Sequence, residues 1–157
     1  MKLAEALAER KALQEQINDL TGRMRANALV QEGDTPSERP EELRAQLEQR
    51  VERLGALIKA INRTNVATRL EDGQMIAEAI TDRDMLNKRF AALDSLADAA
   101  TSRMGGRYSR SELRTVVTID VAPLRRELDE LAQRIRELDV RIQAANWATE
   151  LMESVDA

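Results

Sequence analysis

The chain has 157 residues, of which 43% are apolar and 33% charged, and its net charge is −4. This length and balance are typical of a single folded domain. The sequence contains no histidine and no cysteine, which excludes histidine-dependent nucleophilic triads, disulfides and thiolate metal sites. No long region is strongly basic, so nucleic acid is not an expected partner.

Residues 1–66 predict a first helical hairpin. Apolar residues recur at helical spacing over 2–31 and again over 40–66. Residues 32–39 are rich in turn formers, and Pro40 suits the first position of a helix. The two predicted stripes are formed by Leu3, Leu7, Leu13, Ile17, Leu20, Met24 and Ala28 and by Leu43, Leu47, Val51, Leu54, Leu57, Ile58 and Ile61.

Residues 74–104 and 120–153 predict a second hairpin. The first of these helices has a stripe that includes Ile76, Ile80, Leu86, Phe90, Leu93 and Ala97. The second has apolar residues at alternating spacings of four and three, which predicts a long helix packed on other long helices. Asp120 is placed to cap it. This second stripe is formed by Leu124, Leu128, Leu131, Ile135, Leu138, Ile142, Ala145, Thr149 and Met152.

Two short segments, 67–73 and 107–119, leave the helical pattern. Residues 67–70 could form a short strand before the turn at Asp72 and Gly73, and residues 113–119 are β-branched and alternate. The predicted architecture is therefore an all-α, elongated antiparallel bundle of two long coiled-coil-like hairpins, forming one domain over 1–157 with a small β element.

Arginines cluster in the segment from 103 to 114. Arg103, Arg107, Arg110 and Arg114 surround Tyr108 with only one acid nearby. Guanidiniums and loop N–H groups could bind a phosphate or a carboxylate there. The same arginines could instead pair with acidic helices of a neighbouring chain or remain solvated, and this second interpretation is favoured.

Two polar groups could lie at an interface. Asn65 continues the stripe of the second helix, close to Asn62, so these residues could fix helix register, cap the helix end or form one side of a polar site. Asn146 and Trp147 lie near the end of the last helix. Trp147 could widen the apolar face into a subunit interface or plug the end of the bundle.

The leading function is a non-enzymatic oligomerisation or scaffold protein. Long thin hairpins bury little surface alone, so a homo-oligomer is expected, with a further protein partner as a possibility. Carboxylates alternate with arginines off the apolar stripe, as on a solvated face. No catalytic residue, metal or cofactor is therefore predicted. A protein that binds a small anion through the 103–114 segment is an alternative.

A cytoplasmic location is expected for this chain. Its amphipathic start carries acidic residues, unlike a signal peptide. No apolar run approaches the ~20 residues that a membrane-spanning helix needs, so a membrane partner is not expected.

Several stretches together resemble a family of short bacterial proteins labelled septicolysin or uncharacterised. They include INRTN at 61–65, ATRLEDG at 67–73, RYSRSELRTVVTIDV at 107–121 and LDVRIQAANWATEL at 138–151. The label implies a pore-forming or membrane-active protein, which is a further alternative. The predicted stripes suit helix-to-helix packing better than insertion into a bilayer.

Overall fold

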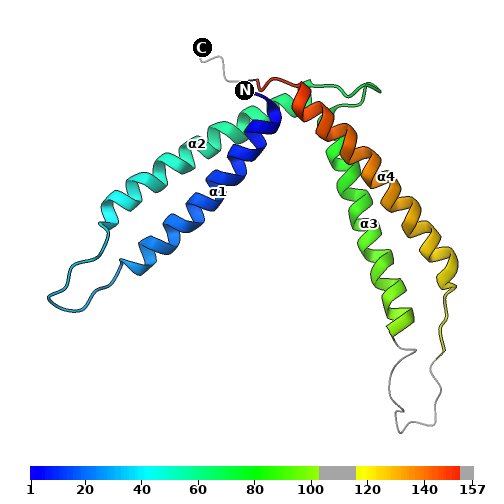
Figure 1. Cartoon of the computed structure of the whole chain (residues 1–157), viewed down its shortest axis with the longest axis horizontal. Coiled ribbons are helices and arrows are strands. Elements are labelled where there is room, and N and C mark those ends of the chain that lie inside the picture. Colours follow the sequence, from blue (N-terminus) through cyan, green and yellow to red (C-terminus); the bar gives the residue numbers. More distant parts are fainter. Residues whose placement is uncertain (103–115, 153–157) are drawn as a thin grey trace, which may run out of the picture. The chain divides into compact units, whose positions relative to one another are not determined.

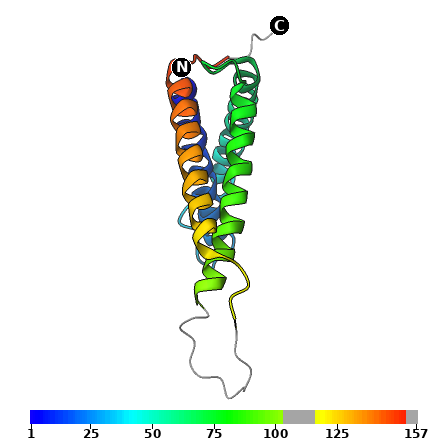
Figure 2. The same ribbon diagram turned by 90° about the vertical axis from the view of Figure 1, so that its right-hand side faces the viewer.

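The computed structural model describes residues 1–102 and 116–152, which form four long helices (Figure 1). Helix α1 (Leu3–Ala26) packs on α2 (Pro40–Ala67). Helix α3 (Ile76–Ser102) lies beside α4 (Val121–Ala148), as Figure 2 shows with this pair facing the viewer. The all-α class and the two paired hairpins predicted from the sequence are confirmed.

Helix starts are fixed by side chains near each first turn. Pro40 occupies the start of α2, as predicted, where its missing N–H is not needed. The Oδ1 atom of Asp120 accepts a hydrogen bond of 3.2 Å from the backbone N–H of Ala122, so the predicted cap of α4 is confirmed. At the start of α1, the Oε2 atom of Glu5 accepts a hydrogen bond of 2.7 Å from the backbone N–H of Lys2.

The chain divides into two compact units. The first contains Met1–Arg69 together with the residues from Ala144 onward, and the second contains Leu70–Gln143. Helix α4 therefore contributes its last residues to the first unit. The single domain expected over 1–157 stays a prediction.

The core of the first unit follows the predicted stripes closely. The residues buried along α1 and α2 are Leu3, Ala6, Leu13, Leu20, Leu43, Leu57, Ala60, Ile61 and Thr64. Val51, which was predicted in the stripe, is 47% exposed. The packing is therefore tightest near the two ends of α2 and looser along its middle.

The stripe of α4 is confirmed from Leu124 to Ala145, whereas Thr149 lies beyond the end of the helix. Leu128, Leu131, Leu138 and Ile142 are buried, and Leu124 and Ile135 are half-buried. Met152 falls outside the stripe, because α4 ends at Ala148 and Met152 is 50% exposed.

The predicted β element does not form a strand in the described residues, and isolated bridge residues stand in its place at Arg69 and Met75. Helix α2 continues to Ala67, and a turn follows in which Leu70 donates to the carbonyl of Gln74 at 2.7 Å. Gly73 sits in this turn at a positive φ of 89°, which favours glycine. Residues 116–119 form no strand, because they have no paired strand within the described ranges, and residues 107–115 lie outside those ranges. An isolated bridge does join Lys2 to Glu150.

Candidate functional site

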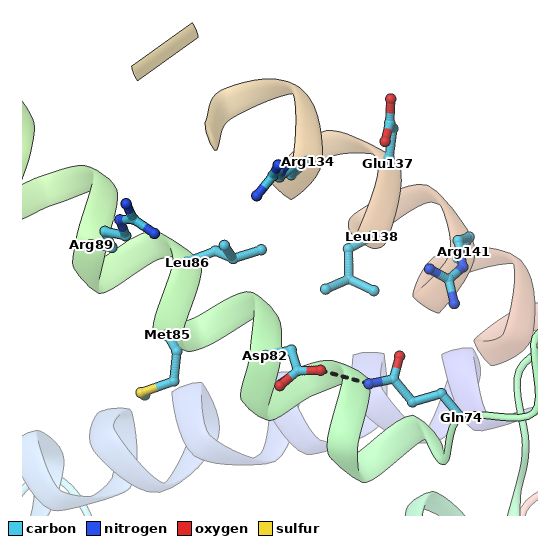
Figure 3. Close-up of a pocket in the computed structure, with 9 residues that line it drawn as sticks. All are labelled: Gln74, Asp82, Met85, Leu86, Arg89, Arg134, Glu137, Leu138 and Arg141. Atoms are coloured by element: carbon cyan, nitrogen blue, oxygen red, sulfur yellow. Dashed lines mark hydrogen bonds between the residues drawn. The ribbon is translucent and has the colours of Figure 1, made fainter. Parts of the chain in front are cut away.

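A groove of about 580 Å³ runs between α3 and α4 in the second unit. Figure 3 shows Leu86 of α3 and Leu138 of α4 pointing toward one another between charged rims. The groove thus combines an apolar floor with charges of both signs. The lining residues are Gln74, Asp82, Met85, Leu86, Arg89, Arg134, Glu137, Leu138 and Arg141.

Two ion pairs cross between the helices of this hairpin. Arg89 Nη2 lies 2.5 Å from Glu127 Oε1, and Arg83 Nη1 lies 3.5 Å from Asp139 Oδ1. The two helices run in opposite directions, and the two arginines are closer along α3 than their partners are along α4, so these pairs set the relative level of the helices only to within about two turns. Ion pairs that remain in contact with solvent contribute little to stability, so the apolar stripe of α4 must supply most of the packing energy.

The turn before α3 closes one end of the groove. Gln74 Nε2 donates a hydrogen bond to Asp82 Oδ2 at 2.6 Å. Arg141 forms an ion pair with Asp72. The pKa of Asp72 is lowered, chiefly by the hydrogen bond from the backbone N–H of Gln74 and further by Arg141. Asp72 therefore stays ionised and ties the turn to α4.

Arg134 differs from the other arginines of the groove. No hydrogen bond or ion pair joins it to another residue within the described ranges, although it lines the groove. One turn along, Glu137 accepts a hydrogen bond of 2.8 Å from Gln133 Nε2 on its own helix, and from no other residue in the described part of the chain. The middle of the groove therefore offers a cation and an anion to an incoming surface.

A second polar cluster lies in the first unit, where three chain segments meet; we call it the terminal junction (Met1–Leu3, Thr64 and 146–152). Leu3 N–H donates to the Thr149 carbonyl at 3.0 Å. Lys2 Nζ lies 2.7 Å from Glu150 Oε1, and this contact is the main reason that the pKa of Glu150 is lowered. These bonds hold the end of the chain's last helix against the start of its first.

Two buried polar side chains sit in the terminal junction. Thr64 is fully buried; its Oγ1 donates to the Ala60 carbonyl and accepts from the Met152 N–H, both at 2.9 Å. Asn146 is 4% exposed, and no described residue bonds its Oδ1. Thr64 is thus satisfied, whereas the buried Oδ1 of Asn146 has no hydrogen-bond donor among residues 1–102 and 116–152.

The predicted polar candidates occupy different environments. Asn62 is exposed, Asn65 is half-buried, Asn146 is buried and Trp147 is 62% exposed. Thr64, which was not among the predicted candidates, is buried in the last turns of α2, between Asn62 and Asn65. Its position three residues after Ile61, in the same apolar stripe, was the signal that could have identified it.

The predicted arginine site, with Arg103, Arg107, Tyr108, Arg110 and Arg114, lies outside the described residues. Within residues 1–102 and 116–152, no group of three or more aspartates and glutamates could hold a metal ion. None of the helices in that part of the chain is long and apolar enough to cross a membrane.

The comparisons place this chain in a family. Residues 10–151 match the family of unknown function DUF6847, and the chain belongs to it. A solved relative, titled "Crystal structure of a functionally unknown conserved protein from Corynebacterium diphtheriae", is 43% identical with a TM-score of 0.91. The similarity covers 97% of this chain and 99% of that chain. No curated protein matches the chain.

These findings correct the predicted family. The resemblance to septicolysin is wrong, because the match over 10–151 is to DUF6847 and the solved relative has no assigned function. The motifs INRTN and ATRLEDG lie at the end of α2 and in the turn that follows it.

Proposed function

We propose that this member of DUF6847 is a non-enzymatic assembly protein that self-associates through its helical hairpins. Its task would be to present or join helical surfaces, either to further copies or to another protein. A cytoplasmic location belongs to the same proposal, and cell fractionation with an antibody to the chain tests it.

The observation that carries the proposal is the poor burial of α3. From residue 80 to residue 96 no side chain of this helix is buried. The same stretch includes Leu86, Phe90 and Leu93, all half-buried, and Met85, which is 51% exposed. A helix with such a stripe normally buries it against another element. A further helical surface would complete the packing.

Three carboxylates of the chain have partners that suit a structural role. The pKa values of Glu38, Asp72 and Glu150 are all lowered, chiefly by hydrogen bonds from Arg23, Gln74 and Lys2 respectively. A carboxylic acid that acts as a general acid near neutral pH needs a raised pKa. These three groups instead remain ionised and hold segments of the chain together.

Light scattering on a sizing column, run over a hundredfold range of protein concentration, tests the proposal. Self-association should give a mass that is a multiple of 17.7 kDa. A mass of one chain at every concentration would overturn self-association. Phe90→Lys should lower the mass by interrupting the half-buried stripe, while Asn87→Lys, at an exposed position of the same helix, should leave it unchanged.

A further inference from the structure

We propose that a second copy of this chain docks antiparallel on the groove between α3 and α4. The two-fold axis would pass between Met85 and Leu86 of α3 and between Ile135 and Arg136 of α4. The inference rests on the proposed self-association and adds to it a surface, an orientation and a register.

The row of charges along α4 is complementary to the same row on a second copy that runs antiparallel to it. Glu130, Arg134, Glu137 and Arg141 are all exposed, and their spacings of four, three and four place them in one row along the helix. The signs along the row alternate. In an antiparallel copy about the proposed axis, Arg134 faces Glu137, and Glu130 faces Arg141. Each of the four residues therefore meets its opposite charge.

The row on α3 has the same property. Asp82 and Arg89 lie equally far from the midpoint between Met85 and Leu86, so the same operation brings Asp82 of each copy against Arg89 of the other. The two apolar side chains at the midpoint meet their counterparts. Such reciprocal contacts define an isologous two-fold interface, which is the commonest kind among homo-oligomers.

The midpoints on the two helices lie at nearly the same level of the hairpin. The pairs Arg83–Asp139 and Arg89–Glu127 bracket both midpoints. The shorter-reaching pair, Arg83–Asp139, places the α3 midpoint about 1.5 Å from the α4 midpoint along the helix axes, at ~1.5 Å per residue. The Arg89–Glu127 pair gives about 7.5 Å, because its long side chains reach along the axes. A single two-fold axis can therefore relate the charged rows of both α3 and α4 to those of the second copy.

The apolar residues would supply the affinity, and the charges would select the register. Exposed ion pairs contribute little net energy, whereas opposing like charges are costly. Burial of Met85 and the half-buried Leu86 would provide the attraction. Arg89 and Arg141 already bond carboxylates of their own chain, but a guanidinium has five donors and can serve a second acceptor. Arg134 has no such intrachain bond in the described part.

Charge reversal on the full-length chain tests the proposal by sizing with light scattering. Arg134→Glu alone places a carboxylate opposite Glu137 of the second copy, twice per interface. Glu137→Arg alone places two cations opposite each other. Each single variant should weaken self-association by at least about tenfold. An equimolar mixture of the two variants should restore it, because both contacts then join opposite charges. Far-UV circular dichroism checks that the helices remain folded.

Arg136→Glu is the matched control, because it makes the same charge change at an exposed position on the opposite face of α4. It should leave the mass unchanged. An oligomer that survives both single reversals would overturn this interface while leaving the proposed function intact. Single reversals that dissociate the oligomer without rescue in the mixture would overturn the antiparallel register. A wild-type chain that is monomeric throughout would overturn both proposals.

Discussion

The two hairpins are held together in different ways. At the tip of the α1–α2 hairpin, Asn27 is buried, and its Oδ1 accepts hydrogen bonds from Ser37 Oγ at 2.9 Å and Glu38 N–H at 3.0 Å. Its Nδ2 donates to the Arg23 carbonyl at 3.0 Å. The terminal junction closes the other end of this hairpin through Thr64 and the bonds around it.

The α3–α4 hairpin is joined by the buried leucines of α4 and by ion pairs between the two helices. Its cross-helix pairs are the ion pairs of Arg83 and Arg89, and α3 buries no side chain from residue 80 to residue 96. Buried, satisfied hydrogen bonds specify a local geometry, whereas exposed ion pairs add little. We infer that the first hairpin mainly provides internal order and that the second provides the surface for assembly.

The largest effect is expected from Leu131→Asp, which places an unpaired charge at a position that is 3% exposed in the α4 stripe. It should cost about 4 kcal/mol of unfolding free energy. Hydrogen exchange should show lost protection in α3 and α4 with protection retained in α1 and α2. Val140→Asp, at a site 67% exposed on the same helix, should change little. Equal loss of protection in both hairpins would show that they unfold as one unit and would break the comparison.

The next effect is expected at the tip of the first hairpin. Asn27→Ala removes the acceptor for Ser37 and for the Glu38 N–H and should cost about 2 kcal/mol in urea unfolding, because donors lose their partner. Asn27→Asp keeps both acceptor contacts and should cost less. If the two variants lose the same stability, the bonds to Oδ1 do not close this hairpin.

Periodic segments were predictable from the sequence because long helices bury one repeated face. Leu128, Leu131, Leu138 and Ile142 are buried as the spacing indicates. The β-branched run at 116–119 was misleading, since Val116 is 68% exposed and no strand forms there. Strand propensity reflects packing on neighbouring strands more than an intrinsic backbone preference, and within the described ranges this segment has no such neighbours.

The groove could not be predicted in the same way. Its rims combine α3 and α4, so the residues that meet depend on the relative register of two helices. The charges of α4 were predicted to form a solvated face, and most are exposed, but Glu127 and Asp139 are half-buried and pair with α3. Their self-complementary order around Arg134 and Glu137 becomes meaningful only once the level of α3 beside α4 is known. Sequence periodicity gives the face of one helix but not the level of its neighbour.

A smaller effect should separate the two buried polar residues of the terminal junction. Asn146→Leu removes a buried acceptor that no described residue bonds and should be neutral or stabilise by up to about 1 kcal/mol. Thr64→Val breaks the bonds to Ala60 and Met152 and should cost about 1 kcal/mol. Thermal unfolding of both variants measures the difference. If Asn146→Leu destabilises the protein, a donor such as a buried water bonds Oδ1. The hydrogen-bonding groups of Asn146 and Thr64 would then be equally well satisfied.

The smallest effect is expected from acid on the tip of the first hairpin. The hydrogen bond from Arg23 lowers the pKa of Glu38 below the ordinary value of 4.5, so this group contributes stability above that value. The contribution is lost as the pH falls through the lowered pKa, because Glu38 is then protonated in the folded chain as well. Arg23→Gln removes the guanidinium that causes the shift. The urea midpoint of wild type should therefore exceed that of Arg23→Gln at pH 7, and the gap should narrow below about pH 4. The same measurement on Asp84→Asn, which removes an exposed partner of Arg83, compares this effect with that of an ion pair in the second hairpin. A gap that widens in acid would have the wrong sign for a carboxylate stabilised in its ionised form, and the Arg23–Glu38 pair would then not stabilise the tip of the first hairpin.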